Sequence, residues 1–275
     1  MTSTFPSRRT RLAALALALL TAGPAWADRL ADIKARGSLI CATLNSSEPL
    51  GFQDLATCKT VGFDVDTCAA IAKHLGVALD LRSVSVEARI PELALGRVDV
   101  VAAALGYTKE RAQQIAFTSA HYQVPIKIIV RVDSGLNKLA DFKGRKISAN
   151  KGSTPELYAR RRTEAEVVTF QDPPAAFLAL QQGKVDGLAL AAPSAVRYVN
   201  ETGGKFRFVD EPLAFEATAL GVKKDEPALL AAVNTALEGM EASGEIDALW
   251  TKWYGPNTKY NLPREKKLTP ISTFE

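Results

Sequence analysis

The sequence contains few residues of the kinds that bind metals or act as catalytic bases. Its 275 residues include only two histidines, His74 and His121, and three cysteines, with no C-x-x-C pair. Zinc sites are built from closely spaced cysteine and histidine ligands, so the sequence indicates no metal site. A Ser/His/Asp constellation is not recognisable either. We therefore expect no catalytic residue and no cofactor, and we expect both histidines to be structural or surface residues.

The sequence also lacks a marked excess of charge outside its first 27 residues. Those residues contain three of the 34 lysines and arginines and none of the 30 acidic residues, so removing them lowers the formal charge from +4 to +1. A near-neutral surface argues against nucleic acid as a partner.

No apolar run is long enough to span a bilayer. The short run from Leu12 to Leu20 follows three arginines and precedes Ala25-Trp26-Ala27, which has the small-residue pattern of a cleavage site. This arrangement is typical of a secretory signal peptide. We predict that residues 1–27 are such a signal, cleaved after Ala27. The pair Arg8-Arg9 also permits a twin-arginine signal, but the residues after it match poorly and the general secretory route is favoured.

Export places a protein in an oxidising compartment, where cysteines commonly form disulfides. With Cys41, Cys58 and Cys68 available, we expect one disulfide and one free thiol. These considerations do not specify which two cysteines pair.

Beyond residue 28, patterns typical of strands and of helices alternate. The predicted strands are residues 39–44, 79–84, a buried run from 98, 127–132, 146–150, 167–170, 185–190 and 206–209. The predicted helices are residues 30–36, a segment with apolar residues at 68, 71, 72 and 75, one opening near 88–91, a short one containing Arg111, one after Pro155, 229–241 and 245–254, while 45–52 is a polar loop. This alternation predicts an α/β fold with a mostly parallel sheet.

The stretch from Val98 to Tyr122 contains the first candidate binding residue. A buried strand ends near Leu105-Gly106, and Arg111 lies in the first turn of the short helix that follows. Open α/β sheets bind ligands beyond the carboxyl ends of their strands, and arginine can hold a carboxylate with two parallel hydrogen bonds. Arg111 is therefore a candidate anion-binding residue, although a solvated helix residue is an equally good interpretation of this stretch alone.

A second candidate site follows the predicted strand that ends at Asn150. Here Ser153 or Thr154 can cap a helix, and Pro155 suits its first turn. Free N–H groups and the positive end of the dipole at a helix N-terminus attract anions. An ordinary helix cap is the simpler alternative.

Five motifs, taken together, resemble one known protein family. They are Gly62-Phe63-Asp64-Val65-Asp66, Thr108–Arg111 with Phe117–Tyr122, Lys151–Thr154, Gly183–Asp186 and Lys252–Gly255. In this order they resemble the periplasmic solute-binding proteins of the polar amino-acid ABC transporter type, family 3 of the bacterial extracellular solute-binding proteins. The resemblance extends from about residue 30 to 255, and one departure is Thr67, where the family usually has an aliphatic residue.

The resemblance implies a periplasmic protein with a two-lobed fold of type II, each lobe a mostly parallel sheet flanked by helices. Lobe 1 is then discontinuous, residues 28–122 plus 216–275, and lobe 2 is residues 123–215, with hinge crossings near Gln123 and Ala217. The ligand binds between the lobes and stabilises the closed form through contacts to both. The resemblance also implies a monomer that delivers a small carboxylate, such as an amino acid, to a membrane ABC permease.

By the same resemblance, Arg111 holds the ligand's α-carboxylate, and Ser153 and Thr154 receive it from the second lobe. Arg89 matches an arginine that meets the side-chain carboxylate in relatives that bind acidic amino acids. An acidic amino acid or a dicarboxylate is therefore the favoured ligand, with a surface helix residue as the alternative interpretation of Arg89.

Two departures concern the ligand's ammonium group. Ala191 replaces an aspartate that usually binds this group. The Ala104 carbonyl or Glu87 could bind the ammonium instead. A carboxylate that has no amine is then a compatible ligand as well. Gly106 replaces a hydroxyl-bearing residue and offers only its backbone groups.

A third departure concerns an aromatic residue that usually covers the ligand. Ser47 or Glu48 stands in its place, although Phe52 could reach the ligand instead. The resemblance also implies that Cys41 pairs with Cys68, because relatives have cysteines at both positions, and that Cys58 is free.

Two other functions compete with that of an importer's binding subunit. An enzyme on the same scaffold, similar to periplasmic cyclohexadienyl dehydratases, needs a proton-transferring carboxylate inside the cleft, for which Glu87 and Glu48 are the candidates. A sensor input module is the second alternative, and with no kinase segment in the sequence it would have to act as a separate partner protein. The binding subunit is favoured over both.

Overall fold

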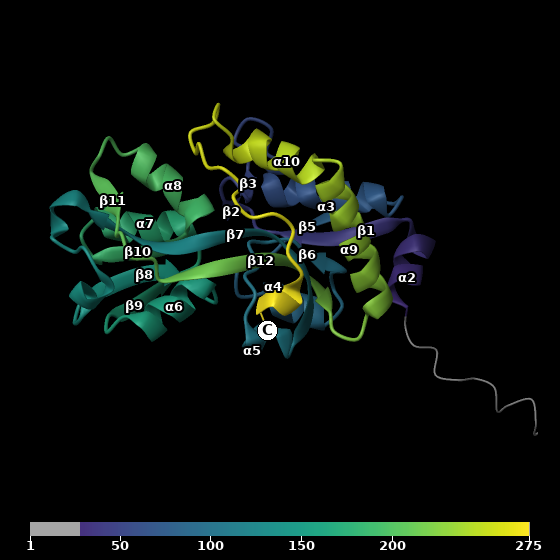
Figure 1. The fold of residues 1–275 in the computed structure, drawn as a ribbon, viewed down its shortest axis with the longest axis horizontal. Helices are drawn as coiled ribbons and strands as arrows, with labels where there is room; N and C mark the ends of the chain where they lie inside the picture. The colour runs from purple at the N-terminus through teal and green to yellow at the C-terminus, as the bar shows by residue number, and fades with distance from the viewer. Residues whose placement is uncertain (1–27, 275) are drawn as a thin grey trace, which may run out of the picture.

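A pair of long antiparallel strands runs through the middle of the fold and connects its two ends (Figure 1). The structure is a computed structural model that describes residues 28–274, and the predicted signal peptide lies outside these residues. β7 (Ile115–Arg131) and β12 (Ala214–Lys223) pair from Ala214–Ile126 to Lys223–Ile115. They lie at the centre of a nine-stranded sheet of order β5-β1-β6-β12-β7-β10-β8-β9, in which β11 also pairs with β7.

The three strands at each end of this sheet are parallel, whereas the strands in its middle are antiparallel. At one end β1 pairs with β5 and β6, and at the other β8 pairs with β9 and β10. The bounds are β1 (Ser38–Thr43), β5 (Ala78–Ser83), β6 (Val100–Val101), β8 (Lys146–Asn150), β9 (Glu166–Phe170), β10 (Gly187–Ala191) and β11 (Phe206–Phe208). The α/β class is confirmed, and the sheet is mixed because β12 is antiparallel to β6 and β7 is antiparallel to β10.

Helices pack against both ends of the sheet. Their bounds are α2 (Arg29–Arg36), α3 (Phe63–His74), α4 (Arg89–Ala94), α5 (Lys109–Ala112), α6 (Thr154–Arg162), α7 (Pro173–Gln181), α8 (Ala192–Asn200), α9 (Pro227–Ala242) and α10 (Glu245–Tyr254). Short 3-10 turns occupy Val132–Ser134, Leu139–Phe142 and Ile271–Phe274. In Figure 1, α2, α3, α9 and α10 gather around the end that contains β1 and β5, and α6, α7 and α8 around the end that contains β8 and β10.

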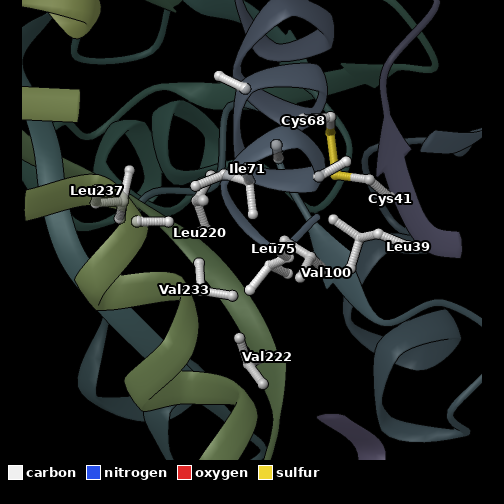
Figure 2. Packing of buried hydrophobic residues seen from close by; sticks show 14 of the residues in the cluster. Leu39, Cys41, Cys68, Ile71, Leu75, Val100, Leu220, Val222, Val233 and Leu237 are labelled. Carbon is white, nitrogen blue, oxygen red and sulfur yellow. A yellow bond between two sulfur atoms is a disulfide. The ribbon is translucent and has the colours of Figure 1, made fainter. Parts of the chain in front are cut away.

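The buried side chains form separate clusters at the two ends. One cluster combines residues 33–102 with residues 220–246, so that Ile71 of α3 packs with Val233 of α9 and Leu39 of β1 (Figure 2). A second cluster at the same end draws on residues 42–117 and Ala219. Two others are made entirely within residues 126–213. A mainly aromatic cluster around Phe63 is the one that draws on both ends.

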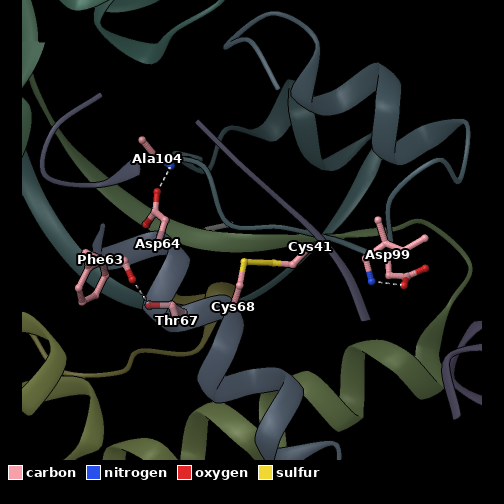
Figure 3. The surroundings of a disulfide bond; sticks show 8 residues. Cys41, Phe63, Asp64, Thr67, Cys68, Asp99 and Ala104 are labelled. Carbon is pink, nitrogen blue, oxygen red and sulfur yellow. Dashed lines mark hydrogen bonds between the residues drawn. A yellow bond between two sulfur atoms is a disulfide. The ribbon is translucent and has the colours of Figure 1, made fainter. Parts of the chain in front are cut away.

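Helix α3 begins at a position that only glycine can occupy. Gly62 has φ +142°, and a Cβ atom there would lie 2.2 Å from the Leu50 carbonyl oxygen. The helix buries Cys68 and Ile71, as the apolar spacing predicts. The unusual Thr67 is accommodated because its buried hydroxyl donates to the Phe63 carbonyl at 2.8 Å (Figure 3).

Three elements differ from the sequence-based expectation. The predicted loop 45–52 contains β2 (Ser46–Ser47) and the start of β3 (Gly51–Gln53), which form a small sheet with β4 (Thr60–Val61). Strand β7 begins at residue 115 rather than 127, and β12 had no predicted counterpart. Each of these two strands supplies the other's hydrogen-bond partners, so neither is determined by its local pattern alone.

The predicted disulfide is confirmed. Cys41 of β1 and Cys68 of α3 are bonded, with their Cα atoms 6.0 Å apart (Figure 3). Cys58 is free and exposed. The disulfide therefore links β1 to α3 inside the hydrophobic core.

Removing this bond is expected to lower stability. It closes a loop with a sequence separation of 27 residues, for which the chain-entropy model gives about 3–4 kcal/mol. We expect the double variant Cys41→Ala/Cys68→Ala to lose about this free energy of unfolding in urea titrations. Cys58→Ala is the matched control and should leave the midpoint unchanged. Equal stability of the double variant and the unmodified protein would contradict the expectation.

Candidate functional site

A small cavity of about 50 Å³ lies where the two ends of the sheet face each other. From one end it is lined by residues that follow β1 and β6 or belong to α4, and from the other by the ends of β8 and β10 and the start of α6. The lining residues are Leu44, Ser47, Val86, Arg89, Ala104, Asn150, Ser153, Thr154, Pro155, Pro173, Leu190, Ala191, Ser194 and Glu216. This is the carboxyl edge of parallel strands, where α/β proteins bind their ligands.

Arg89 is a buried cation in the wall of this cavity. It is 3% exposed, so it is not a surface residue of α4. Its guanidinium donates to the carbonyls of Ala103 at 2.7 Å, Ala104 at 2.8 Å and Gly152 at 3.3 Å, and to that of Val86 at 2.7 Å. Burial, together with the charge of Arg111, lowers the pKa of Arg89 to about 9, so the group stays charged at neutral pH.

Ala104 has a strained backbone that polar neighbours hold from both sides. Its φ of +48° lies in the left-handed region, which costs a residue with a Cβ atom about 1–3 kcal/mol. The Ala104 N–H donates to Asp64 Oδ2 at 2.9 Å (Figure 3), while its carbonyl accepts from Arg89. The Ala104 carbonyl, predicted as a partner for the ligand's ammonium group, is thus already occupied as an acceptor by Arg89.

Asp64, in the first turn of α3, is a buried carboxyl group. Burial raises its pKa to about 7, against the opposing effects of the Ala104 N–H and the charge of Arg89. The Asp64 carboxyl therefore titrates near neutral pH.

Arg111 lies beside the cavity, outside its immediate lining. Its guanidinium donates to the Gly106 carbonyl at 2.6 Å and, across to the turn before α6, to the Gly152 carbonyl at 2.9 Å. The Thr108 hydroxyl caps the short helix α5 by accepting from the Arg111 N–H at 3.1 Å. Arg111 and Arg89 thus share the Gly152 carbonyl, and two positive charges meet there.

The N-terminus of α6 faces the same cavity. Of the two predicted capping residues, Ser153 is the N-cap: its hydroxyl accepts from the Glu156 N–H at 3.2 Å and donates to the Asn150 carbonyl at 2.6 Å. Pro155 occupies the first turn. Thr154 is buried, and its hydroxyl donates to the carboxylate of Glu216.

Glu216 is the principal cavity residue that sequence reasoning missed. It comes from β12, is 5% exposed, and lies against Gly106, where a Cβ atom would be 2.2 Å from Glu216 Oε2. Burial raises the pKa of Glu216, while the Thr154 hydrogen bond and the charges of Arg111 and Arg89 oppose the shift. A signal was present, because Glu216 is the single charged residue between Pro212 and Val222.

The remaining predicted residues divide into those that line the cavity and those that do not. Ser47 is buried in the lining, and Ala191 contributes no polar side-chain group. Phe52 is not among the lining residues; its ring packs edge-on against Trp253 with centroids 5.9 Å apart. Its predicted covering role therefore has no support in this arrangement.

The two carboxylates considered for proton transfer lie in ion pairs instead. Glu48 pairs with Arg197 and with Lys259 at 2.9 Å, and Glu87 pairs with Lys151 at 2.8 Å. Neither is among the residues that line the cavity.

Both histidines have structural surroundings, as expected. His74 lies 3.0 Å from Glu245 at the surface, whereas burial lowers the pKa of His121 to about 3 and keeps it neutral. Within residues 28–274 no group of three or more His, Cys, Asp or Glu side chains could hold a metal ion. No helix in this part of the chain has the length and apolar character needed to cross a membrane.

Comparisons with known proteins agree on one family. The model of the bacterial extracellular solute-binding proteins, family 3, matches residues 39–256. A glutamine-binding protein of an ABC transporter from Bacillus subtilis is 28% identical over 82% of this chain and 84% of its own. A mutant of ArgBP from T. maritima has a TM-score of 0.76 at 29% identity, covering 82% of this chain and 98% of that one. An ancestral arginine-binding protein bound to arginine has a TM-score of 0.75 at 33% identity, covering 80% and 99%.

Asp64→Asn is expected to change how stability depends on pH. Between about pH 4 and pH 7 the folded protein keeps a proton on Asp64 that the unfolded chain has released, since the pKa rises from 3.8 to about 7 on folding. Stability contributed by this group therefore falls as the pH rises through that window, by on the order of 4 kcal/mol.

The measurement is the free energy of unfolding at several pH values between 4 and 7. Relative to Asp64→Asn, the unmodified protein should lose stability steadily across the window. Asp133→Asn is the control, at an exposed carboxylate whose pKa is lowered by Arg131. This variant retains Asp64, so its stability should fall between pH 4 and pH 7 as that of the unmodified protein does. A difference between protein and Asp64 variant that does not vary with pH would contradict the assignment.

Proposed function

The chain belongs to the bacterial extracellular solute-binding proteins of family 3, and from this membership we propose that it is the amino-acid-binding subunit of an ABC importer. The named relatives are binding proteins, not enzymes. They include proteins that bind glutamine and arginine, which supports the class of ligand rather than one member of it. Neither Glu48 nor Glu87, the two carboxylates considered for a dehydratase, lines the cavity, and the choice of a binding subunit follows the named relatives.

The convergence of positive groups on one cavity supports the carboxylate-binding role. The guanidiniums of Arg89 and Arg111 approach from one end of the fold, and the capped N-terminus of α6, with Ser153 and Thr154, approaches from the other. A carboxylate placed among them would find charge-assisted donors on both sides. Contacts to both ends are what allows a ligand to favour a closed form.

The distribution of the cores supports a division into two lobes. We assign residues 28–122 and 216–275 to lobe 1 and residues 123–215 to lobe 2. The lobes are joined where the paired strands β7 and β12 pass from one lobe to the other, near Gln123 and Ala217. In support, four of the hydrophobic clusters fall entirely within one lobe or the other. Among the clusters formed by residues 28–274, the aromatic one around Phe63 alone crosses the boundary, so relative motion of the lobes disrupts little buried packing.

The charge balance of the cavity favours an acidic amino acid or a dicarboxylate. Arg89 and Arg111 contribute two positive charges, while the two acids that oppose them, Glu216 and Asp64, both have pKa values raised by burial. A zwitterionic ligand adds no net charge, so a second carboxylate on the ligand would neutralise the excess. The donors of Arg89 are already directed at carbonyls, so this preference acts through charge more than through a dedicated hydrogen bond.

Export and delivery complete the proposal. Residues 1–27 act as the signal peptide, the mature protein begins after Ala27, and it works in the periplasm as a monomer. Ligand release to a membrane permease follows from opening of the lobes. A thermal-shift screen of amino acids, 2-hydroxy acids and dicarboxylates tests this role, and the absence of any stabilising carboxylate would overturn it.

Arg111→Ala is expected to weaken ligand binding without unfolding the protein. At a ligand concentration of 100 times Kd, mass action stabilises the unmodified protein by about 2.7 kcal/mol. Loss of a charge-assisted bond lowers the affinity at least about tenfold, which reduces that stabilisation at the same concentration to about 1.4 kcal/mol or less. Unfolding curves with and without the best ligand of the screen measure both quantities.

Arg161→Ala is the matched control. Arg161 of α6 pairs with Glu110 of α5 at 2.7 Å at the surface, whereas Arg111 of α5 reaches the Gly152 carbonyl in the turn before α6. Removal of Arg161 should leave the ligand-induced stabilisation intact. If Arg111→Ala retained the full stabilisation, Arg111 would not be the carboxylate anchor.

A further inference from the structure

An amino acid carries an ammonium group as well as a carboxylate, and a buried site must supply a partner for each charge. The residue at 191, where the family pattern has an acid, is an alanine that lines the cavity without a polar side-chain group. Among the lining residues that the structure describes, the carboxylate of Glu216 is the sole acidic group. The acidic group at this cavity therefore comes from β12, whereas position 191 at the end of β10 supplies none.

The position of Glu216 depends on a second departure from the family pattern. Gly106 stands where relatives have a hydroxyl-bearing residue, and a Cβ atom at this position would lie 2.2 Å from Oε2, 2.5 Å from Cδ and 2.8 Å from Cγ of Glu216. Glycine at 106 thus leaves the space that the carboxylate fills.

A neighbouring amide oxygen independently indicates a missing hydrogen-bond donor. Asn150, at the end of β8, is 5% exposed and lines the same cavity. Its Oδ1 atom is buried and has no hydrogen-bond partner among the described residues. A buried acceptor without a donor is costly, and a ligand N–H group is the kind of donor that would satisfy it.

We propose that Glu216 is the residue that binds the ligand's ammonium group, with Asn150 Oδ1 as a second acceptor. This inference rests on the proposed amino-acid-binding function and names the residue that makes the site selective for an amine. In the present arrangement Glu216 accepts from Thr154 and lies near both guanidiniums. The ligand's carboxylate takes over those donors when it binds, and the ammonium replaces them as the partner of Glu216. Each buried charge thereby keeps a partner.

The test compares each amino acid with the 2-hydroxy acid that has the same side chain, because the two differ only in the ammonium group. The probes are the twenty common L-amino acids and the matched hydroxy acid of each one that binds. Isothermal titration gives the ratio of the two dissociation constants for the unmodified protein and for Glu216→Gln. We expect the preference for the amino acid to fall at least about tenfold in the variant, as loss of a charge-assisted bond implies.

Two further variants distinguish this role from others. Gly106→Ala places a methyl group where Glu216 Oε2 lies, so it should reduce the same preference, and it should have little additional effect in the presence of Glu216→Gln. Glu164→Gln, at a surface carboxylate paired with Lys143 at 2.7 Å, is the control and should leave the ratio unchanged. Circular dichroism confirms that each variant is folded.

The ratio, rather than the affinity, decides the outcome. If Glu216 only competed with the ligand's carboxylate, Glu216→Gln would strengthen binding of both compounds equally, and if Glu216 were only structural, both would weaken equally. An unchanged ratio in either case overturns the inference and leaves the proposed function standing. Binding of hydroxy acids or dicarboxylates but of no amino acid overturns the inference together with the amino-acid ligand of the proposed function, and leaves only the carboxylate-binding role. Binding of no carboxylate of any kind overturns the inference together with the proposed function.

Discussion

The guanidinium of Arg89 donates hydrogen bonds to backbone carbonyls from both ends of the fold, and the shape of the cavity depends on these hydrogen bonds. Ala103 and Ala104 follow β6, whereas Gly152 belongs to the turn before α6. A buried cation must have acceptors on all sides, because an unpaired charge in a low-dielectric interior is very unfavourable. Arg89 therefore fixes the left-handed turn at Ala104 and holds the two ends of the fold in contact around the ligand site.

Two buried acids near this cation, Asp64 and Glu216, each have a hydrogen-bond partner. Asp64 accepts from the N–H of Ala104, and Glu216 lies between Thr154 and the two guanidiniums. Burial raises the pKa of both acids, which shows that desolvation outweighs their favourable contacts. Such a site is poised for a ligand that brings charges of its own, because new partners for groups already buried are gained without a further desolvation cost on the protein side.

The departures from the family pattern are best understood as one coordinated change. Taken singly, the losses at Gly106 and Ala191 weaken the case for an amine in the ligand. In three dimensions Gly106 provides the room that Glu216 fills, so an acid from β12 lines the cavity while Ala191 contributes no polar side-chain group. A negative group in the same cavity can be supplied from a different strand, since electrostatic complementarity depends on position in space and not on position in the sequence.

The sequence by itself determined the features that are encoded locally or by a chain of motifs. The apolar spacing of α3, the cap and proline of α6, the α/β alternation and the likeness that implied the Cys41–Cys68 pair all agree with the structure. The length of β7, the presence of β12, the burial of Arg89 and the entry of Glu216 into the cavity were decided by tertiary structure alone. Each of these depends on partners far away in the chain, and a pairing over such a separation leaves no periodic signal in either segment.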